Sequence, residues 1–170
     1  MLLVEGDPWA DWFNGLQHSA FHLEVRDVYV EPSENSRFRA FLAGEPASDE
    51  PPAPWHALMR KVTDRGIPVT RVRVVTVPHS DYHRWLLSVT DRNIQSGEDI
   101  RYLPRRDAGE VPPDDFWLFD DERVVYNLAG DGGEPAGAAV TKDPRIVDYC
   151  RGVRDRLWKL ATPYTEYVTT

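Results

Sequence analysis

Residues 69–77 read Val-Thr-Arg-Val-Arg-Val-Val-Thr-Val, and this run is the strongest strand signal in the chain. β-Branched residues fill most of its positions, which is typical of a β-strand. A helix is expected next, because Ser80 is a good N-cap residue and Gly97 is a good stop. Its predicted inner face consists of Tyr82, Trp85, Leu86 and Val89. The fold is therefore organised around a strand followed by a covering helix.

Downstream of this unit the pattern predicts more strands and one further helix. The expected strands are 100–103, 116–119, 124–128 and 138–141, of which 116–119 and 124–128 form a hairpin. Asp143-Pro144 begins the last helix, since Asp caps well and Pro suits the first helical position. Its expected apolar stripe is Ile146, Cys150, Val153, Leu157 and Leu160. This order predicts an α/β (α+β) fold, with a mixed β-sheet flanked by helices.

Upstream, the chain is expected to begin with a short helix after Asp7-Pro8, carrying Trp9, Trp12 and Phe13. Alternating residues then predict a strand from 21 to 30, bent near Asp27, and a second strand at 37–42.

A loop rich in Pro and acidic residues at 43–54 is the best internal boundary, and a helix from Trp55 to Gly66 follows it. We therefore expect a single domain over 1–170, with a helix-strand extension at 1–50 and an α/β core at 51–170.

Composition narrows the class of protein. Of the 170 residues, 41% are apolar, which suffices for a hydrophobic core. The net charge of −8 argues against non-specific binding to nucleic acid or to anionic membranes. The lone Cys150 excludes an internal disulfide and a cysteine-based zinc site. The acidic N-terminus does not resemble a signal peptide, so the expected compartment is the cytoplasm.

Four phrases carry a resemblance to a known family: FHLEVRDVY at 21–29, RVRVVTVPHSDYHRW at 71–85, GEDIRYLPR at 97–105 and DFWLFDDERVVYNL at 115–128. They resemble an actinobacterial family defined as a domain of unknown function. Members of that family are often encoded beside helix-turn-helix regulators. The resemblance implies a regulatory or signalling context, with such a regulator as the protein partner.

The element order from residue 69 onward also resembles one half of a phospholipase D-like fold. Those enzymes carry a His-x-Lys-x4-Asp motif, in which the His attacks phosphorus and the Lys holds the phosphoryl oxygens. In the matching register this chain has Asp115, Trp117 and Glu122 instead, and it has no His-x-Lys pair. The resemblance therefore implies a degenerate, non-hydrolytic member.

Phospholipase D-like halves pair across a two-fold axis, and this chain has one such half. The missing half is expected either from a homodimer or heterocomplex, or from residues 1–66, whose Trp9 and Trp12 would cover the sheet.

Arg71 and Arg73 alternate with Val72 and Val74, so both guanidinium groups are expected on one face of the sheet. The predicted strand runs into the N-terminus of the next helix, where free N–H groups favour anions. The ligand-binding residues predicted on this basis are Arg71, Arg73, His79, Arg84, Arg101 and Asp115. They would hold a phosphate- or carboxylate-bearing ligand, with no cofactor. Alternatively, Arg71 and Arg73 form a solvated face paired with Glu98, Asp99 and Asp115.

The remaining motifs give weaker evidence for a functional site. His79 and His83 have a spacing that could bind a metal, but no third ligand can be named. His18 and His22 share the spacing, yet on a strand they lie too far apart to hold one ion. Phe116-Trp117-Leu118-Phe119 predicts either a strand buried on both sides or an aromatic surface for a partner. No nucleophile elbow, Walker loop or dinucleotide fingerprint is present.

Two functional hypotheses follow. The first is a non-enzymatic regulatory or ligand-sensing domain that acts through a protein partner, with no predicted catalytic residue. The second is a phosphodiesterase or nuclease with a non-standard site near Arg71, His79 and Asp115.

Overall fold

A computed structural model of the chain describes residues 1–32, 34–46, 53–130 and 132–169. Its strands are β1 (Leu2–Val4), β2 (Ala20–Glu24), β3 (Val69–Val75), β4 (Glu98–Pro104), β5 (Phe116–Phe119), β6 (Arg123–Ala129), β7 (Pro135–Thr141) and β8 (Thr162–Pro163). Its helices are α1 (Trp9–Asn14), α2 (Asn35–Leu42), α3 (Pro54–Thr63), α4 (Asp81–Gln95), α5 (Arg105–Ala108), α6 (Pro144–Leu160) and α7 (Tyr164–Tyr167).

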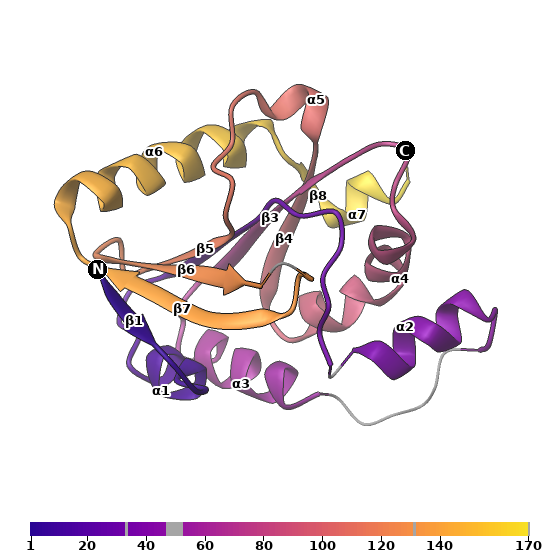
Figure 1. Ribbon diagram of the computed structural model, residues 1–170, viewed down its shortest axis with the longest axis horizontal. Helices are drawn as coiled ribbons and strands as arrows, with labels where there is room; N and C mark the ends of the chain where they lie inside the picture. The colour runs from indigo at the N-terminus through magenta and orange to yellow at the C-terminus, as the bar shows by residue number, and fades with distance from the viewer. Residues whose placement is uncertain (33, 47–52, 131, 170) are drawn as a thin grey trace.

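All the described strands belong to one mixed sheet in the order β1-β7-β6-β5-β2-β3-β4-β8. The pairs β2–β3 and β3–β4 are parallel, whereas the other pairs are antiparallel. Figure 1 shows α6 on one side of this sheet and α1 and α3 on the other. The predicted mixed sheet flanked by helices is confirmed. In particular β2, from the first fifty residues, lies in the middle of the sheet between β5 and β3.

The α6 face of the sheet is closed by apolar side chains. Val72 and Val74 of β3 and Leu23 of β2 pack against Cys150 and Leu157 of α6. Leu157 is fully buried, as the sequence pattern predicted. The observed stripe of α6 differs at its ends, because Val147 is buried in place of Ile146 and Leu160 is half exposed.

The opposite face is closed by α1 and α3 at one end. Phe13 of α1 and Met59 and Val62 of α3 pack against Trp117 and Phe119 of β5. Trp9 and Trp12 pack against the same cluster, which confirms that the first helix lies on the sheet.

The predicted helix starts after Ser80 and Asp143 are confirmed, and the last helix ends at Leu160. The Ser80 hydroxyl accepts a hydrogen bond from the His83 amide, and the Asp143 carboxylate accepts one from the Arg145 amide. Gly97 ends α4 with a φ of +96°, and a Cβ there would lie 2.2 Å from the Thr63 hydroxyl, so the position favours glycine.

Two predictions for residues 26–42 were wrong. The strand expected to continue to Val30 stops at Glu24, because the Asp27 carboxylate binds the Thr76 amide and hydroxyl and draws the chain away from the sheet. The strand expected at 37–42 is the helix α2, whose Phe38 and Phe41 pack beside Trp85 of α4. Alternation over six residues could not separate the two cases, since Phe38, Phe41 and Leu42 also fit helical spacing.

Within the loop predicted at 43–54, residues 47–52 lie outside the described residues, and α3 already begins at Pro54. The short elements β1, α5, β8 and α7 were not predicted. No helix among the described residues has both the length and the apolarity needed to cross a membrane.

Candidate functional site

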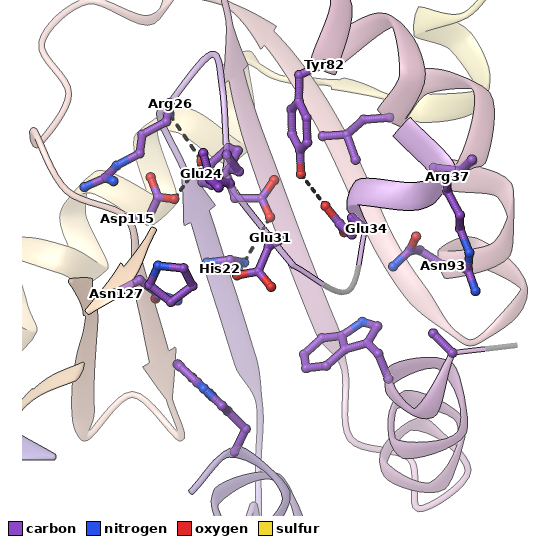
Figure 2. Close-up of a pocket in the computed structure, with 18 of the residues that line it drawn as sticks. His22, Glu24, Arg26, Glu31, Glu34, Arg37, Tyr82, Asn93, Asp115 and Asn127 are labelled. Atoms are coloured by element: carbon purple, nitrogen blue, oxygen red, sulfur yellow. Dashed lines mark hydrogen bonds and ion pairs between the residues drawn. The ribbon is translucent and has the colours of Figure 1, made fainter. Parts of the chain in front are cut away.

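The face of the sheet opposite α6 holds a cavity of about 1260 Å³. It lies over β2, β3 and β5, between α3 and α4, and the segment from Tyr29 to Pro46 contributes to its wall. The polar residues at its floor are His22, Glu24, Arg71, Arg73, Asp115 and Asn127. Figure 2 shows His22 and Glu24 on β2, with Asp115 and Asn127 beside them and Tyr82 with Glu34 across the opening.

Glu24 lies at the centre of a buried ion network on this floor. One carboxylate oxygen binds Nη1 of Arg71, and the other lies 2.6 Å from Nε of Arg73. Burial alone would raise the pKa of Glu24, but the charges of Arg73 and Arg71 outweigh it and hold that pKa well below its ordinary value. Glu24 is therefore ionised at neutral pH.

The charge of Arg71 is also balanced by a second carboxylate, that of Glu98. Its Nη2 lies 2.7 Å from Oε1 of Glu98, whose side chain is fully buried. The other Glu98 oxygen accepts from Nε1 of Trp55 at 3.0 Å and from Nδ2 of Asn93 at 2.6 Å. The Arg71 guanidinium also lies over the rings of Trp55 and Trp117, 5.8 and 5.5 Å from their centroids.

The guanidinium group of Arg73 is also engaged by hydrogen bonds inside the fold. Its Nη1 donates to the Thr90 hydroxyl at 2.9 Å and to the Tyr102 hydroxyl at 2.8 Å, in addition to the Glu24 bond. Burial would lower the pKa of Arg73, but Glu24 and Tyr102 raise it well above the ordinary value. Both floor arginines thus stay charged, and their charges are compensated by Glu24 and Glu98.

His22 differs from these residues because its ring nitrogens have no hydrogen-bond partner among the described residues. The imidazole stacks on Trp117 with ring centroids 4.1 Å apart and planes within 9°. It is 7% exposed, and neither ring nitrogen makes a hydrogen bond to the described residues. Nδ1 lies 3.4 Å from Oε1 of Glu24, but this contact lacks hydrogen-bond geometry. Burial, reinforced by the Arg71 charge, lowers the pKa of His22 well below its ordinary value, so the ring is neutral.

Other unsatisfied polar atoms gather in the same cavity. Among the described residues, eight buried side-chain N or O atoms lack a hydrogen-bond partner, and five belong to residues lining the cavity. These five are both ring nitrogens of His22, Nδ1 of His56, Nε of Arg71 and Oδ1 of Asn127. Since unsatisfied buried polar atoms are costly, their concentration marks the cavity as a place where water or a ligand completes the structure.

Asp115 closes the floor next to the end of β2. Its Oδ1 accepts from the Val25 amide at 2.8 Å and its Oδ2 from the Tyr29 hydroxyl at 2.6 Å. Burial, aided by the Glu24 charge, raises the pKa of Asp115 to about 6. Asp115 therefore changes charge near neutral pH, and it also anchors the start of the segment that leads to α2.

Two more carboxylates lie on the wall. Glu34 accepts a 2.7 Å hydrogen bond from the Tyr82 hydroxyl, and a turn in which the Glu34 amide binds the Glu31 carbonyl brings the two residues together. Burial raises the pKa of Glu31 and of Glu34, and the charge of Glu34 raises that of Glu31 further.

The structure brings together three of the six residues predicted to bind a ligand: Arg71, Arg73 and Asp115. The other three do not line this cavity. The imidazole of His79 lies between the Thr76 carbonyl and the Tyr167 hydroxyl. Arg84 is an exposed side chain beside Asp81 on α4. Arg101 stacks on Trp158 of α6, 3.9 Å from the ring centroid.

The most informative floor residues, His22 and Glu24, were not predicted as site residues. Their signal was present, because residues 21–26 alternate apolar and polar side chains in the same way as residues 71–74. Two adjacent strands with polar side chains on one face indicate a polar floor. The contributions of Trp55 and Asn127 come from distant segments and had no local signal.

A protein-family model described as "Domain of unknown function (DUF6879)" matches residues 7–169. The chain belongs to the DUF6879 family. No curated protein matches this DUF6879 chain significantly.

Solved structures similar to this DUF6879 protein share its fold at low sequence identity. TrmBL2, an archaeal chromatin protein described as showing a novel mode of DNA binding, matches at 13% identity and TM-score 0.50, over 90% of this chain and 48% of that one. The present chain thus spans about half the length of TrmBL2. Nuc from Salmonella typhimurium, a phospholipase D family member, matches at 12% identity and TM-score 0.53, over 91% of this chain and 87% of that one.

Phosphatidylserine synthase from Haemophilus influenzae matches at 12% identity and TM-score 0.47, over 92% of this chain and 37% of that one. The match to Nuc shows that the DUF6879 protein has a phospholipase D-like fold. In the register given by its sequence, the positions of the motif His and Lys are Asp115 and Trp117, and both line the cavity. Glu122, at the position of the motif Asp, is exposed in the β5–β6 turn.

Proposed function

We propose that this DUF6879 protein is a non-enzymatic ligand-sensing domain, in which the cavity on the sheet binds a small organic molecule. The observation that carries the proposal is the gathering of unpartnered buried polar atoms in the cavity, above all both nitrogens of His22. Pockets that bind small molecules combine aromatic walls with a few convergent polar groups. Trp55, Trp85 and Trp117 supply such walls here.

Binding is favoured over phosphodiester hydrolysis by the state of the polar side chains. A phosphoryl group needs cationic donors, but the guanidinium groups of Arg71 and Arg73 are engaged by Glu24 and Glu98. Two imidazoles line the cavity, those of His22 and His56. His22 is stacked on Trp117 and has no carboxylate in hydrogen-bond geometry to orient it, and Nδ1 of His56 also lacks a hydrogen-bond partner. The hydrolytic alternative placed its histidine at His79, which does not line the cavity.

The regulatory part of the proposal rests on the resemblance described from the sequence. Occupancy of the cavity would be transmitted to a protein partner, for which a helix-turn-helix transcription regulator is the proposed class. Co-expression with a helix-turn-helix regulator encoded next to the gene, where there is one, should yield a stable complex. Light scattering of the protein alone distinguishes a homodimer from a 19.5 kDa species.

The ligand-binding proposal is tested by thermal shift with a library of metabolites grouped by charge. At least one group should raise the Tm of the parent by several degrees. The same compounds should have no effect on a His22→Phe variant, which fills the floor and removes the unpartnered nitrogens. A parallel assay with bis(4-nitrophenyl) phosphate should show no turnover. Turnover that disappears in His22→Ala or His83→Ala would instead establish a phosphodiesterase.

A further inference from the structure

The charges around the cavity are unevenly compensated. On the floor, Arg71 and Arg73 are balanced by Glu24 and Glu98 through three contacts of hydrogen-bond length or shorter. On the wall, no ion pair within the described parts of the chain joins Glu31 or Glu34 to an arginine or lysine. Among the residues that the structure describes, the Glu34 carboxylate accepts its hydrogen bond from the neutral Tyr82 hydroxyl. Arg26, Arg37 and Arg92 also line the cavity, but Arg26 pairs with Asp114, and neither Arg37 nor Arg92 is without a partner. The wall charges without an ion-pair partner among the described residues therefore include the carboxylates of Glu31 and Glu34.

Aromatic rings line the same cavity as these two carboxylates. Tyr82 and Trp85 of α4 form a cluster with Tyr29, Phe38 and Phe41 from the segment that carries Glu31 and Glu34. The rings of Tyr29 and Tyr82 lie 5.5 Å apart, and those of Tyr82 and Trp85 also lie 5.5 Å apart. Ring faces attract an ammonium group, and they also cover the apolar carbons attached to it.

His22 is an independent sign that a ligand enters. Its imidazole is more than nine-tenths buried, lines the cavity and has two unpartnered nitrogens. A neutral imidazole offers one N–H donor and one acceptor nitrogen. A hydroxyl group on the ligand can satisfy either of them, whereas an anion would compete with Glu24 for Arg71 beside it.

We infer that the ligand is an organic amine: its ammonium group lies between Glu31 and Glu34, its apolar body lies against Tyr82 and Trp85, and a hydrogen-bonding group at its other end reaches His22. This inference rests on the proposed ligand-binding function and specifies the chemical class of the ligand. It replaces the anionic ligand expected from Arg71 and Arg73, since the charges of those arginines are already used inside the fold. The site would reject carboxylates and phosphates through the same two glutamates.

Three probes with a common hydroxyphenyl body test the inference: tyramine, its neutral alcohol analogue tyrosol, and anionic 3-(4-hydroxyphenyl)propanoate. Their dissociation constants are measured by calorimetry on the full chain. Tyramine should bind at least tenfold more tightly than tyrosol, and the propanoate should bind most weakly. The variant Glu31→Gln/Glu34→Gln keeps the side-chain shape. In this variant tyramine and tyrosol should have about equal dissociation constants.

The matched control is Asp148→Asn/Asp155→Asn, which removes the same charge from exposed positions on α6. Because the whole chain is acidic, this control separates the local carboxylates from the net charge of −8. It should keep the full preference for tyramine. The inference is overturned if the control loses that preference as well, or if tyrosol or the propanoate binds the parent as tightly as tyramine does.

Failure of the inference is distinguishable from failure of the proposed function. Tight binding of a neutral or anionic probe that is lost in His22→Phe would contradict the amine and leave the ligand-sensing cavity intact. If none of the three probes binds at millimolar concentration, the amine is also wrong. A metabolite library without any stabilising compound would then remove the proposed function too.

Discussion

The two faces of the central strands β2 and β3 carry side chains of opposite polarity. Toward α6, β2 and β3 present Leu23, Val72 and Val74 to an apolar core. Toward the cavity, the same strands present His22, Glu24, Arg71 and Arg73, all of them more than nine-tenths buried. Burying charges costs several kcal/mol for each ion unless they are paired, so the second face contributes less to stability than an apolar one would. The α6 side of β2 and β3 thus contributes apolar packing, whereas on the proposed function the charged side of the same strands serves binding.

The largest expected effect comes from breaking the ion network. Glu24→Gln removes the charge shared by Arg71 and Arg73 and leaves two buried guanidinium groups under-compensated. The expected loss in the free energy of unfolding is about 3–5 kcal/mol, measured by urea denaturation at pH 7. A loss below 1 kcal/mol would mean that the network is solvated and that the two faces do not differ as described.

Shortening side chains on each face should separate stability from binding. Leu157→Ala on α6 leaves a cavity in the apolar core and should cost about 2–5 kcal/mol. At a temperature where the variant remains folded, its affinity for a cavity ligand should equal that of the parent. Trp117→Ala should cost a similar free energy and should also abolish binding, because it removes the surface on which His22 stacks. Equal binding by both variants would contradict the division between the faces.

The pH dependence of stability should report on Asp115. Its folded pKa of about 6 lies above the ordinary value of 3.8 for an aspartate, so the folded state holds this proton more tightly than the unfolded state. Asp115 therefore makes the free energy of unfolding decrease as pH rises from about 4 to about 6, by roughly 2–3 kcal/mol in total. Asp115→Asn removes this contribution, so the difference between variant and parent should change over that interval and be constant above pH 7. A difference independent of pH would show that Asp115 is ionised with an ordinary pKa.

The smallest effect is expected at a predicted site residue outside the cavity. Arg84 and Asp81 form an exposed ion pair, with side chains 59% and 61% exposed. Arg84→Ala should change the free energy of unfolding by less than about 0.5 kcal/mol. Its ligand affinity should match that of the parent, and a tenfold loss in a binding titration would place Arg84 in the site.

Much of the fold could be predicted because local chemistry agrees with tertiary structure in most elements. The strand predicted in the run 69–77 formed and ends at Val75. The Ser80 and Asp143 caps and the hairpin at 116–128 also formed as expected. The failures occurred where a distant contact decided the outcome. Asp27 leaves the sheet because it binds Thr76, and α2 is helical because Phe38 and Phe41 meet an aromatic surface on α4.

The site was predictable only in part for the same reason. Alternation placed Arg71 and Arg73 on one face, which the structure confirms. The alternative pairing with Glu98 is confirmed for Arg71. The pairing of both arginines with Glu24 was not predicted, since this partner comes from a neighbouring strand and depends on strand order. Whether a buried arginine offers its charge to a ligand is decided by partners that no local pattern contains.

The central claim is that ligands bind on the cavity face and leave the α6 face unchanged. The tryptophans report on both faces, because Trp55, Trp85 and Trp117 line the cavity and Trp158 lies on α6 beneath Arg101. Indole ¹H–¹⁵N spectra should be recorded while the protein is titrated with the compound that raises its Tm most. We predict shifts of the cavity indoles and no shift of the Trp158 indole. A shift of Trp158 equal to or larger than those of the cavity indoles would contradict the account.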